Sequence, residues 1–288
     1  MKSLVWFITG ASRGLGLEIA RAALERGDAV VAAARDPKAA ERALGQGNHL
    51  LTVELDVTNE GQAQAAVSAA LKRFGRIDVL VNNAGRGLLG AVEEASAEEV
   101  RSVFAVNVDG LLTVTRAVLP SMRQRRSGRI LNVSSVGGFG AWPGWGVYCA
   151  TKFAVEGLSE ALHAELLPLG IHVTIIEPGT FRTDFLDASS LRRAARVIAH
   201  YSKSGGTARQ WADTTNHNQL GDPVKGAAAI ATVATSTEPP LRVQLGTDSL
   251  ARVEAKLALV ATELAAWRTL AESTDREQAG TATSLPPV

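Results

Sequence analysis

Short apolar runs alternate with alanine-rich helical patterns from the start of the chain to about residue 180. A short run of aliphatic residues between polar or glycine positions is typical of a strand buried on both faces of a parallel sheet. Such runs predict strands at Leu4–Ile8, Ala29–Ala34, Leu50–Glu54, Val79–Asn82, Arg129–Val133 and His172–Ile176. Helical spacing predicts helices at about Leu15–Arg26, Pro37–Leu44, Glu60–Phe74, Ala97–Arg123 and Tyr148–Leu167.

The alternation stops after Pro178-Gly179. From Asp184 to Gly221 the chain is polar, with a helical pattern only around Leu191–His200. A long irregular segment inside a compact domain is commonly functional, so we interpret residues 184–221 as a substrate lid. Regular patterns then resume, and they predict a helix at Pro223–Ala234, a strand at Leu241–Leu245 and a C-terminal helix over residues 248–271.

Strands that alternate with crossover helices predict an α/β fold. We expect one doubly wound Rossmann-type domain over residues 1–272, with a mainly parallel sheet of about seven strands, helices on both faces and a C-terminal helical extension. Residues 273–288 are expected to form a flexible tail.

The C-terminal helix carries an apolar seam at alternating spacings of four and three residues. The seam consists of Val253, Leu257, Val260, Leu264 and Trp267. It would pack either against its own domain, which we favour, or against another subunit.

Composition narrows the function classes. The 288 residues are 46% hydrophobic and 20% charged, with a net charge of +1. This charge gives no general electrostatic reason to bind nucleic acid or an acidic membrane. The single cysteine, Cys149, allows no internal disulfide, and the histidines have no metal-binding spacing. The histidine spacing leads us to expect no metal. Since no apolar run is long enough to span a membrane, we expect a cytoplasmic protein.

A glycine-rich loop lies between the first strand and the first helix, at Thr9–Gly16. Gly10, Gly14 and Gly16 allow a tight turn and a close approach of the backbone to the pyrophosphate of a dinucleotide, at a helix N-terminus. Ser12, Arg13 and Leu15 complete the loop. The alternative is a glycine-rich turn that binds nothing, which the position after a strand disfavours.

The tip of the second strand decides between NAD(H) and NADP(H). An acidic residue there binds the 2′-hydroxyl, whereas an arginine attracts the 2′-phosphate. Here Ala34 is followed by Arg35, and Arg13 in the glycine loop is a second cation. We predict NADP(H), unless Asp36 faces the ribose instead.

Further polar residues follow the third and fourth strands. Asp56 and Val57 end one strand, and Asn82 begins an Asn-Asn-Ala-Gly segment that continues through Asn83, Ala84 and Gly85. Ligands bind at this edge of an open α/β sheet. Asp56 could accept a hydrogen bond from the adenine, and Asn82 could hold the neighbouring loops; a turn-forming role is the structural alternative.

Tyr148 and Lys152 are four residues apart, so on a helix they lie on one face. A neighbouring ammonium favours the phenolate form of a tyrosine and so supports acid–base chemistry. This spacing alone is common, and its meaning depends on the motifs upstream.

Together these motifs resemble the classical short-chain dehydrogenase/reductase family. The resemblance covers about Ser3 to Thr183, in order. It is carried by the loop Thr9–Gly16, the segment Asn82–Gly85, Asn107, Ser135 at thirteen residues before Tyr148, the Y-x-x-x-K pair, and Pro178-Gly179 followed by Thr183.

The resemblance implies a role for each matched residue. Tyr148 would be the general acid/base, and Lys152 would lower its pKa and bind the nicotinamide ribose. Ser135 would polarise the carbonyl, and Asn107, through a distortion of its helix, would hold a water of a proton relay. The implied cofactor contacts are Gly10, Ser12, Arg13, Gly14, Leu15, Gly16, Arg35, Asp56, Val57, Asn83, Ala84, Gly85, Tyr148, Lys152, Pro178, Gly179 and Thr183.

The implied activity is NADP(H)-dependent interconversion of a ketone and a secondary alcohol. The long lid and the C-terminal helix are similar to those of family members that act on hydroxysteroids, retinoids and similar bulky carbonyls. For this chain we expect a homodimer or a homotetramer. Trp142 and Trp145 would wall an apolar substrate pocket or stiffen their loop. The alternative function is a catalytically silent nicotinamide-binding sensor or scaffold.

Overall fold

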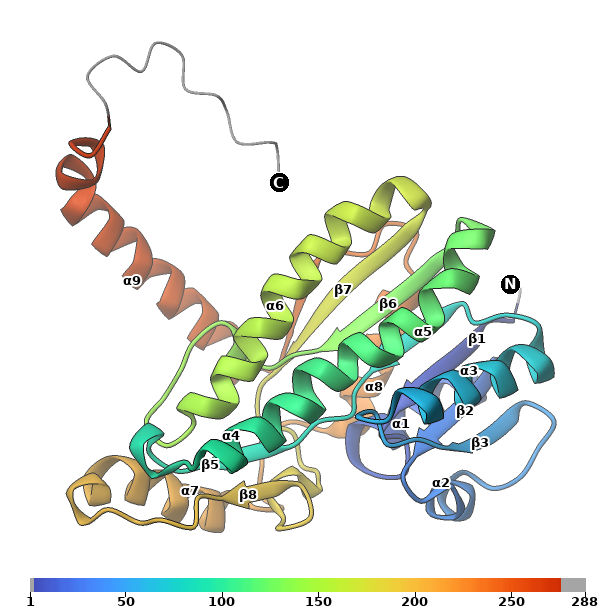
Figure 1. Cartoon of the computed structure of the whole chain (residues 1–288), viewed down its shortest axis with the longest axis horizontal. Coiled ribbons are helices and arrows are strands. Elements are labelled where there is room, and N and C mark those ends of the chain that lie inside the picture. Colours follow the sequence, from blue (N-terminus) through green and yellow to red (C-terminus); the bar gives the residue numbers. More distant parts are fainter. Residues whose placement is uncertain (1–2, 276–288) are drawn as a thin grey trace.

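A seven-stranded parallel sheet forms the centre of the molecule (Figure 1), in the computed structural model, which describes residues 3–275. The strand order is β3-β2-β1-β4-β6-β7-β9. The order reverses between β1 and β4, where a doubly wound sheet opens a crevice for a ligand. The strands are β1 Val5–Thr9, β2 Ala29–Ala34, β3 Leu50–Glu54, β4 Val79–Asn82, β6 Gly128–Val133, β7 Ile171–Pro178 and β9 Arg242–Leu245.

Helices cover both faces of the sheet. They are α1 Gly14–Glu25, α2 Pro37–Leu44, α3 Glu60–Phe74, α4 Ala97–Phe104, α5 Gly110–Arg125, α6 Gly146–Leu166 and α8 Pro223–Thr235. A further helix, α9 Thr247–Glu272, follows β9. Successive side chains of a strand point to opposite faces. Accordingly, Trp6 and Ile8 of β1 pack with α1 and α8, whereas Phe7 packs with α3 and α5. The predicted single Rossmann-type domain is confirmed.

The predicted helix Ala97–Arg123 is interrupted by a π-helical turn, Ala105–Asp109. Its start is confirmed: Ser96 and Glu99 form a capping box. By length and composition alone the segment Ala97–Arg125 could span a membrane. In the fold, however, its apolar residues Val114 and Val118 pack into the core on the sheet.

The lid is more regular than its sequence suggests. Leu191–Arg193 forms β8, which pairs in parallel with β5, Gly87–Leu89, in a separate two-stranded sheet. The helical pattern predicted around Leu191–His200 is therefore wrong. Pairing with a distant strand overrides the local preference at residues 191–193, and only a 3₁₀ turn, Ala199–Tyr201, begins at its end. A helix does form further along, α7 Thr207–Thr215.

The C-terminal helix leaves the domain. In Figure 1, α9 projects from the edge of the sheet beside β9. Val253 is buried, but Leu257, Leu264 and Trp267 are 55–65% exposed. The prediction that the seam packs against its own domain is therefore wrong beyond Val253. Most of the predicted tail, from residue 276 on, lies outside the described residues.

Candidate active site

A cavity of about 1330 Å³ opens at the carboxyl ends of the central strands. Its walls come from the glycine loop, the N-terminal part of α6 and the lid. All of the predicted catalytic and cofactor-binding residues except Gly16 and Asn107 line it. The fold therefore gathers into one place residues that the sequence separates by up to 173 positions, from Gly10 to Thr183.

Asn83 holds the glycine loop in place. Its side-chain amide donates to the carbonyl oxygens of Thr9 and Gly10, at 3.0 and 3.2 Å. The Thr9 hydroxyl in turn accepts from the backbone N–H groups of Asn83 and Ala84, both at 3.0 Å. A Cβ at Gly16 would lie 2.3 Å from the Asn83 amide nitrogen. Gly16 thus serves close packing rather than contact with a ligand.

The end of β2 leaves Arg35 exposed at the cavity. Asp36 also lines the cavity, but its carboxylate caps α2 by accepting from the Ala39 N–H at 3.1 Å, and it lies 3.5 Å from Arg42. The guanidinium of Arg13 donates to the Ser189 hydroxyl at 2.7 Å. Arg13 therefore ties the glycine loop to the lid instead of converging with Arg35.

Sequence analysis missed a third arginine, Arg86, which lines the same part of the cavity. Burial lowers the pKa of Arg86, and repulsion from Arg192 and Arg35 lowers it further. The carboxyl of Asp56 partly offsets this, and its own pKa is lowered chiefly by the Thr58 hydroxyl, at 2.7 Å. The position of Arg86 directly after Asn-Asn-Ala-Gly was the available signal. Clustered guanidiniums favour an anion.

Two of the catalytic candidates, Ser135 and Tyr148, converge around Gly137. A Cβ at that glycine would lie 3.4 Å from the Ser135 hydroxyl and 3.4 Å from the Tyr148 ring. One turn along α6, the Lys152 ammonium donates to the Val133 carbonyl at 2.8 Å and lies 5.9 Å from the centroid of the tyrosine ring. Tyr148 and Lys152 do share one helix face, as their spacing predicts.

Burial dominates the protonation of this group. It raises the pKa of Tyr148 above its usual range, and the Ser135 hydroxyl acts in the opposite direction. Burial also lowers the pKa of Lys152 to about 8, although the Glu156 carboxylate opposes it. The net direction for the tyrosine is opposite to the lowering predicted from the neighbouring lysine. The phenol form is stabilised, which suits a proton donor.

Asn107 lies in the π-helical turn, so the helix distortion that the family resemblance implies is present. Its side-chain amide donates to the Arg86 carbonyl and to the Thr151 hydroxyl, both at 2.9 Å, and its carbonyl accepts from the Arg86 N–H. A Cβ at Gly85 would lie 3.4 Å from the Asn107 carbonyl oxygen and 3.8 Å from the Lys152 ammonium. Asn107 therefore lies behind the lysine, outside the cavity wall.

Aromatic side chains surround the tyrosine. Trp145 lies edge-on to Tyr148, with centroids 5.8 Å apart, and edge-on to Trp211 of the lid at 6.2 Å. Phe185 approaches Tyr148 at 5.5 Å. Trp142 also lines the cavity, and its ring lies under the Arg252 guanidinium at 4.2 Å. Of the two roles left open for the tryptophans, the structure supports the pocket wall; Phe185 and Trp211 were not anticipated.

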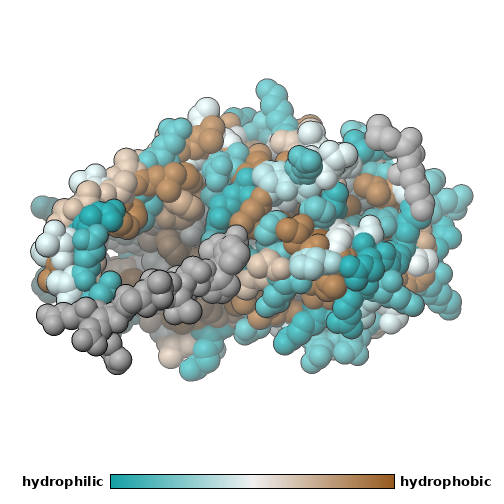
Figure 2. All heavy atoms as spheres, turned by 90° about the horizontal axis from the view of Figure 1, so that it is seen from above, coloured by the Kyte–Doolittle hydropathy of each residue, from teal (hydrophilic) through white to brown (hydrophobic). Residues whose placement is uncertain are grey.

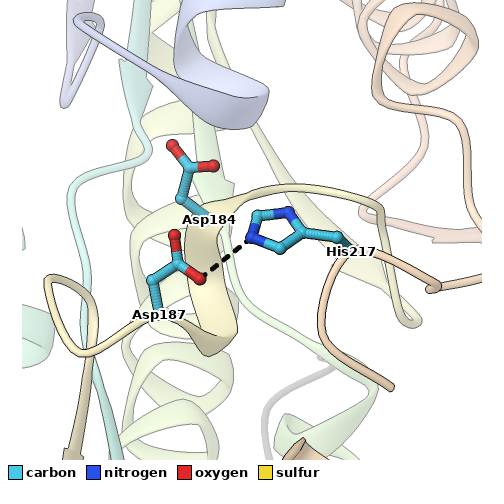
Figure 3. A group of neighbouring side chains, drawn as sticks. All are labelled: Asp184, Asp187 and His217. Carbon is cyan, nitrogen blue, oxygen red and sulfur yellow. Dashed lines mark ion pairs between the residues drawn. The ribbon is translucent and has the colours of Figure 1, made fainter. Parts of the chain in front are cut away.

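No metal was expected, yet the lid brings together Asp184, Asp187 and His217 (Figure 3). Their ligand atoms all lie within 4.8 Å of one another. Figure 3 shows the imidazole directed at Asp187, with an ion pair at 3.1 Å. Asp187 and His217 are therefore already engaged with each other. Since none of the three is buried, the arrangement is an ordinary surface cluster and identifies no metal.

Two relatives resemble this chain over nearly its whole length. Oxidoreductase BOA17 of Botryotinia fuckeliana is 37% identical over 92% of this chain and 97% of its own length. The 3-ketodihydrosphingosine reductase of Bacteroides thetaiotaomicron is 37% identical over 85% of this chain and 89% of its own.

Solved structures of related proteins have the same fold. A short-chain dehydrogenase from Streptomyces avermitilis has a TM-score of 0.89 at 39% identity, covering 95% of this chain and 99% of that one. A 3-ketoacyl-(acyl-carrier-protein) reductase from Brucella melitensis, complexed with NADH, has a TM-score of 0.73 at 31% identity, covering 88% and 99%. An alcohol dehydrogenase from Thermococcus sibiricus, complexed with 5-hydroxy-NADP, has a TM-score of 0.69 at 27% identity, covering 85% and 96%.

The two complexes contain different nicotinamide dinucleotides, so they do not distinguish NAD from NADP. The model of the family described as short chain dehydrogenase matches residues 4–194, which hold the glycine loop, Asn107, Ser135, Tyr148 and Lys152. With this match and relatives that cover the whole domain, the chain belongs to the short-chain dehydrogenase/reductase family of oxidoreductases.

Proposed function

We propose that the protein is an NADP(H)-dependent reductase that interconverts a bulky ketone and its secondary alcohol, with Tyr148 as the general acid/base. The observation that carries the proposal is the buried Tyr148 phenol, beside Ser135 and Lys152, in a cavity that joins the glycine loop to a ring of aromatic side chains. A binding module has no need of a proton donor at this place.

The residues at the glycine loop fit a dinucleotide. Gly10 and Gly14 have φ values of 67° and 56°, which leave the loop backbone open toward the cavity at the N-terminus of α1. Arg35 and Arg86 supply positive charge at the adenosine end, where a 2′-phosphate would relieve their mutual repulsion. The bound cofactor would supply the hydride. Asp36, engaged as a helix cap, offers little competition for a 2′-hydroxyl.

Side chains of the protein would supply the proton that reduction of the carbonyl consumes. In reduction the Tyr148 phenol would give its proton to the carbonyl oxygen, which the Ser135 hydroxyl would orient. The Lys152 ammonium is held by the Val133 carbonyl and keeps further N–H bonds free for a ribose or a water. Asn107 positions this region through Arg86 and Thr151.

The cavity supports a large, mostly apolar substrate. Its volume of about 1330 Å³ exceeds the roughly 300–1,000 Å³ of ordinary ligand sites and leaves room for a dinucleotide and a bulky carbonyl compound. Trp145, Phe185 and Trp211 form the apolar wall. Gln219 lines the cavity and is buried, and within the described chain its side-chain oxygen has no hydrogen-bond partner, so it is an acceptor for a polar group of the ligand. The similarity to the 3-ketodihydrosphingosine reductase of Bacteroides thetaiotaomicron supports a ketone substrate.

The test is ketone reduction followed by NADPH absorbance, with a panel of long-chain aliphatic, steroid and small ketones. We expect turnover with the bulky ketones and a loss of at least about 10³-fold in kcat for Tyr148→Phe, with little change in the Kd for NADPH. Cys149→Ala, at the adjacent helix position, is the matched control and should retain most activity. NADPH binding without turnover of any ketone would favour the sensor or scaffold instead.

A further inference from the structure

Among residues 3–275, no other segment covers the part of α9 that projects beyond the domain. Every residue from Leu257 to Asp275 is exposed. The exposed large hydrophobic residues of the helix include Leu250, Leu257, Leu259, Val260, Leu264, Trp267 and Leu270. In Figure 2 brown, hydrophobic residues are visible on the part of the molecule where this helix projects. In proteins most of the stability of a helix comes from packing of its apolar face, so this exposed face favours a partner that covers it.

With one more apolar residue at its N-terminal end, Leu250, the seam follows a heptad repeat. Leu250, Leu257 and Leu264 occupy the a positions, and Val253, Val260 and Trp267 occupy the d positions. Alternating steps of three and four residues give the 3.5-residue period of two helices packed side by side. Val253 is already in contact with the domain, so the open part of the seam begins with Leu257.

Two other candidates to cover the seam, the residues after Asp275 and a membrane surface, fit poorly. After Asp275 the sequence offers only Leu285 and Val288 as large apolar residues, too few to cover the seam. A helix that lies on an anionic membrane carries a lysine- or arginine-rich face. In α9 the acidic residues Asp248, Glu254, Glu263 and Glu272 outnumber the basic residues Arg252, Lys256 and Arg268.

The flanking charges fit a second copy in the opposite direction. Lys256 and Glu263 occupy the same heptad position, g, one heptad apart. In an antiparallel pair g faces g, so Lys256 of each copy meets Glu263 of the other, and the contact forms twice about the two-fold axis. This register also places Leu257 against Val260 and Leu250 against Trp267. In a parallel pair g faces e, so Glu263 would meet Arg268, but Lys256 would meet only Ala261. A parallel pair would also bring both domains, against which Val253 packs, to the same end of the contact.

We propose that α9 is a dimerisation helix, which packs through its seam against α9 of a second copy in antiparallel orientation, with two Lys256–Glu263 pairs. The helix of 26 residues spans about 39 Å at 1.5 Å per residue, so the two catalytic domains lie at opposite ends of the contact.

The association of the full chain, measured by sedimentation velocity and light scattering over a range of concentrations, tests this interface. Leu264→Glu should weaken self-association at least about tenfold, since it buries a charge at an a position. Thr262→Glu, on the opposite side of the helix, is the matched control and should leave the mass unchanged. Circular dichroism of both variants checks that the domain is folded.

Charge exchange tests the orientation. Lys256→Glu and Glu263→Lys should each weaken the dimer about two- to fivefold, and the double exchange should restore it, because only the double variant has opposite charges in register. Retained affinity in Lys256→Glu would overturn the antiparallel pairing. A monomeric wild-type chain, or a dimer insensitive to Leu264→Glu, would overturn the interface, as would binding of the monomer to anionic vesicles through the seam.

Discussion

Two buried carboxyl groups share one guanidinium near Lys152. Arg242 lies 3.2 Å from Glu156 of α6 and 3.4 Å from Glu177 of β7. Burial raises the pKa of both carboxyls, that of Glu156 to about 7. Glu156 lies one turn beyond Lys152, and its charge supports the ammonium form of that lysine. Protonation here is therefore linked to both folding and the active site.

This linkage predicts a pH-dependent gain in Glu156→Gln. Between its ordinary pKa of 4.5 and about 7, the folded chain retains a proton on Glu156 that the unfolded chain releases. The wild type therefore loses stability as the pH rises to about 7, and loses no more above it. We expect the variant to equal the wild type near pH 5 and to exceed it by about 2 kcal/mol above pH 7.

Urea unfolding of both proteins from pH 5 to 9 would measure this difference. Glu160→Gln removes an exposed partner of the same arginine and should show no such pH dependence, because the Glu160 carboxyl stays in contact with water in the folded chain. A difference between wild type and Glu156→Gln that is constant with pH would contradict the assignment.

Single residues divide into those that the sequence could place and those it could not. Ser135, Tyr148 and Lys152 were found because their spacing along one strand end and one helix is local. The direction of the tyrosine pKa was not, since it depends on burial, to which Phe185 contributes from a distant segment and Trp145 from the residue before α6. Arg13 was likewise placed in the right loop but with the wrong partner, because its partners lie on the lid.

At the scale of elements, Glu94 fixes the lid to the domain. It follows β5 at the end of a 3₁₀ turn, Val92–Glu94, and its carboxylate accepts from the N–H groups of Ala91 and Ile198, both at 2.8 Å. It also pairs with Arg209 of α7. These contacts lower the pKa of Glu94 to about 2, against the opposing effect of burial.

Breaking this contact should loosen the lid. Glu94→Gln leaves Arg209 without its buried counter-charge, at a cost of about 3 kcal/mol or more at neutral pH. The contribution of a carboxyl with a lowered pKa is present above its ordinary pKa of 4.5 and is lost as the pH falls toward 2. We expect faster hydrogen exchange in α7 and a higher KM for the ketone, with the Kd for NADPH nearly unchanged.

Asp213→Asn is the matched control, because Asp213 pairs with Arg193 on the lid surface, where both side chains are exposed. Such a pair contributes little, so the exchange of α7 should stay near the wild-type rate. If the two variants gave equal exchange, Glu94 would not hold the lid.

The elements show where local patterns suffice. Strands β2, β3 and β4 begin and end where the sequence predicts, since each is a short run rich in apolar residues; β2 and β4 are buried, and β3 at the edge of the sheet is partly exposed. The lid was mispredicted because β8 depends on pairing with β5, about 100 residues earlier in the chain. The seam of α9 was identified correctly, but which partner covers a helix face is not encoded in its period.

At the scale of the whole molecule, the cavity joins the sheet edge to the lid, so one ligand should stabilise both. A ligand present at about 100 times its Kd adds about 2.7 kcal/mol to the stability, which raises the Tm of a domain of this size by roughly 5–10 °C. We expect NADPH to produce this shift and NADH at equal concentration to produce a smaller one, since Arg35 and Arg86 attract the 2′-phosphate. In Arg35→Asp the order should reverse, because the new carboxylate repels the phosphate and accepts from the 2′-hydroxyl. Tyr148→Phe should retain the NADPH shift of the wild type while losing turnover. Differential scanning fluorimetry of the three proteins with each cofactor measures these shifts, and equal shifts from NADPH and NADH in the wild type would rule out the NADP(H) assignment.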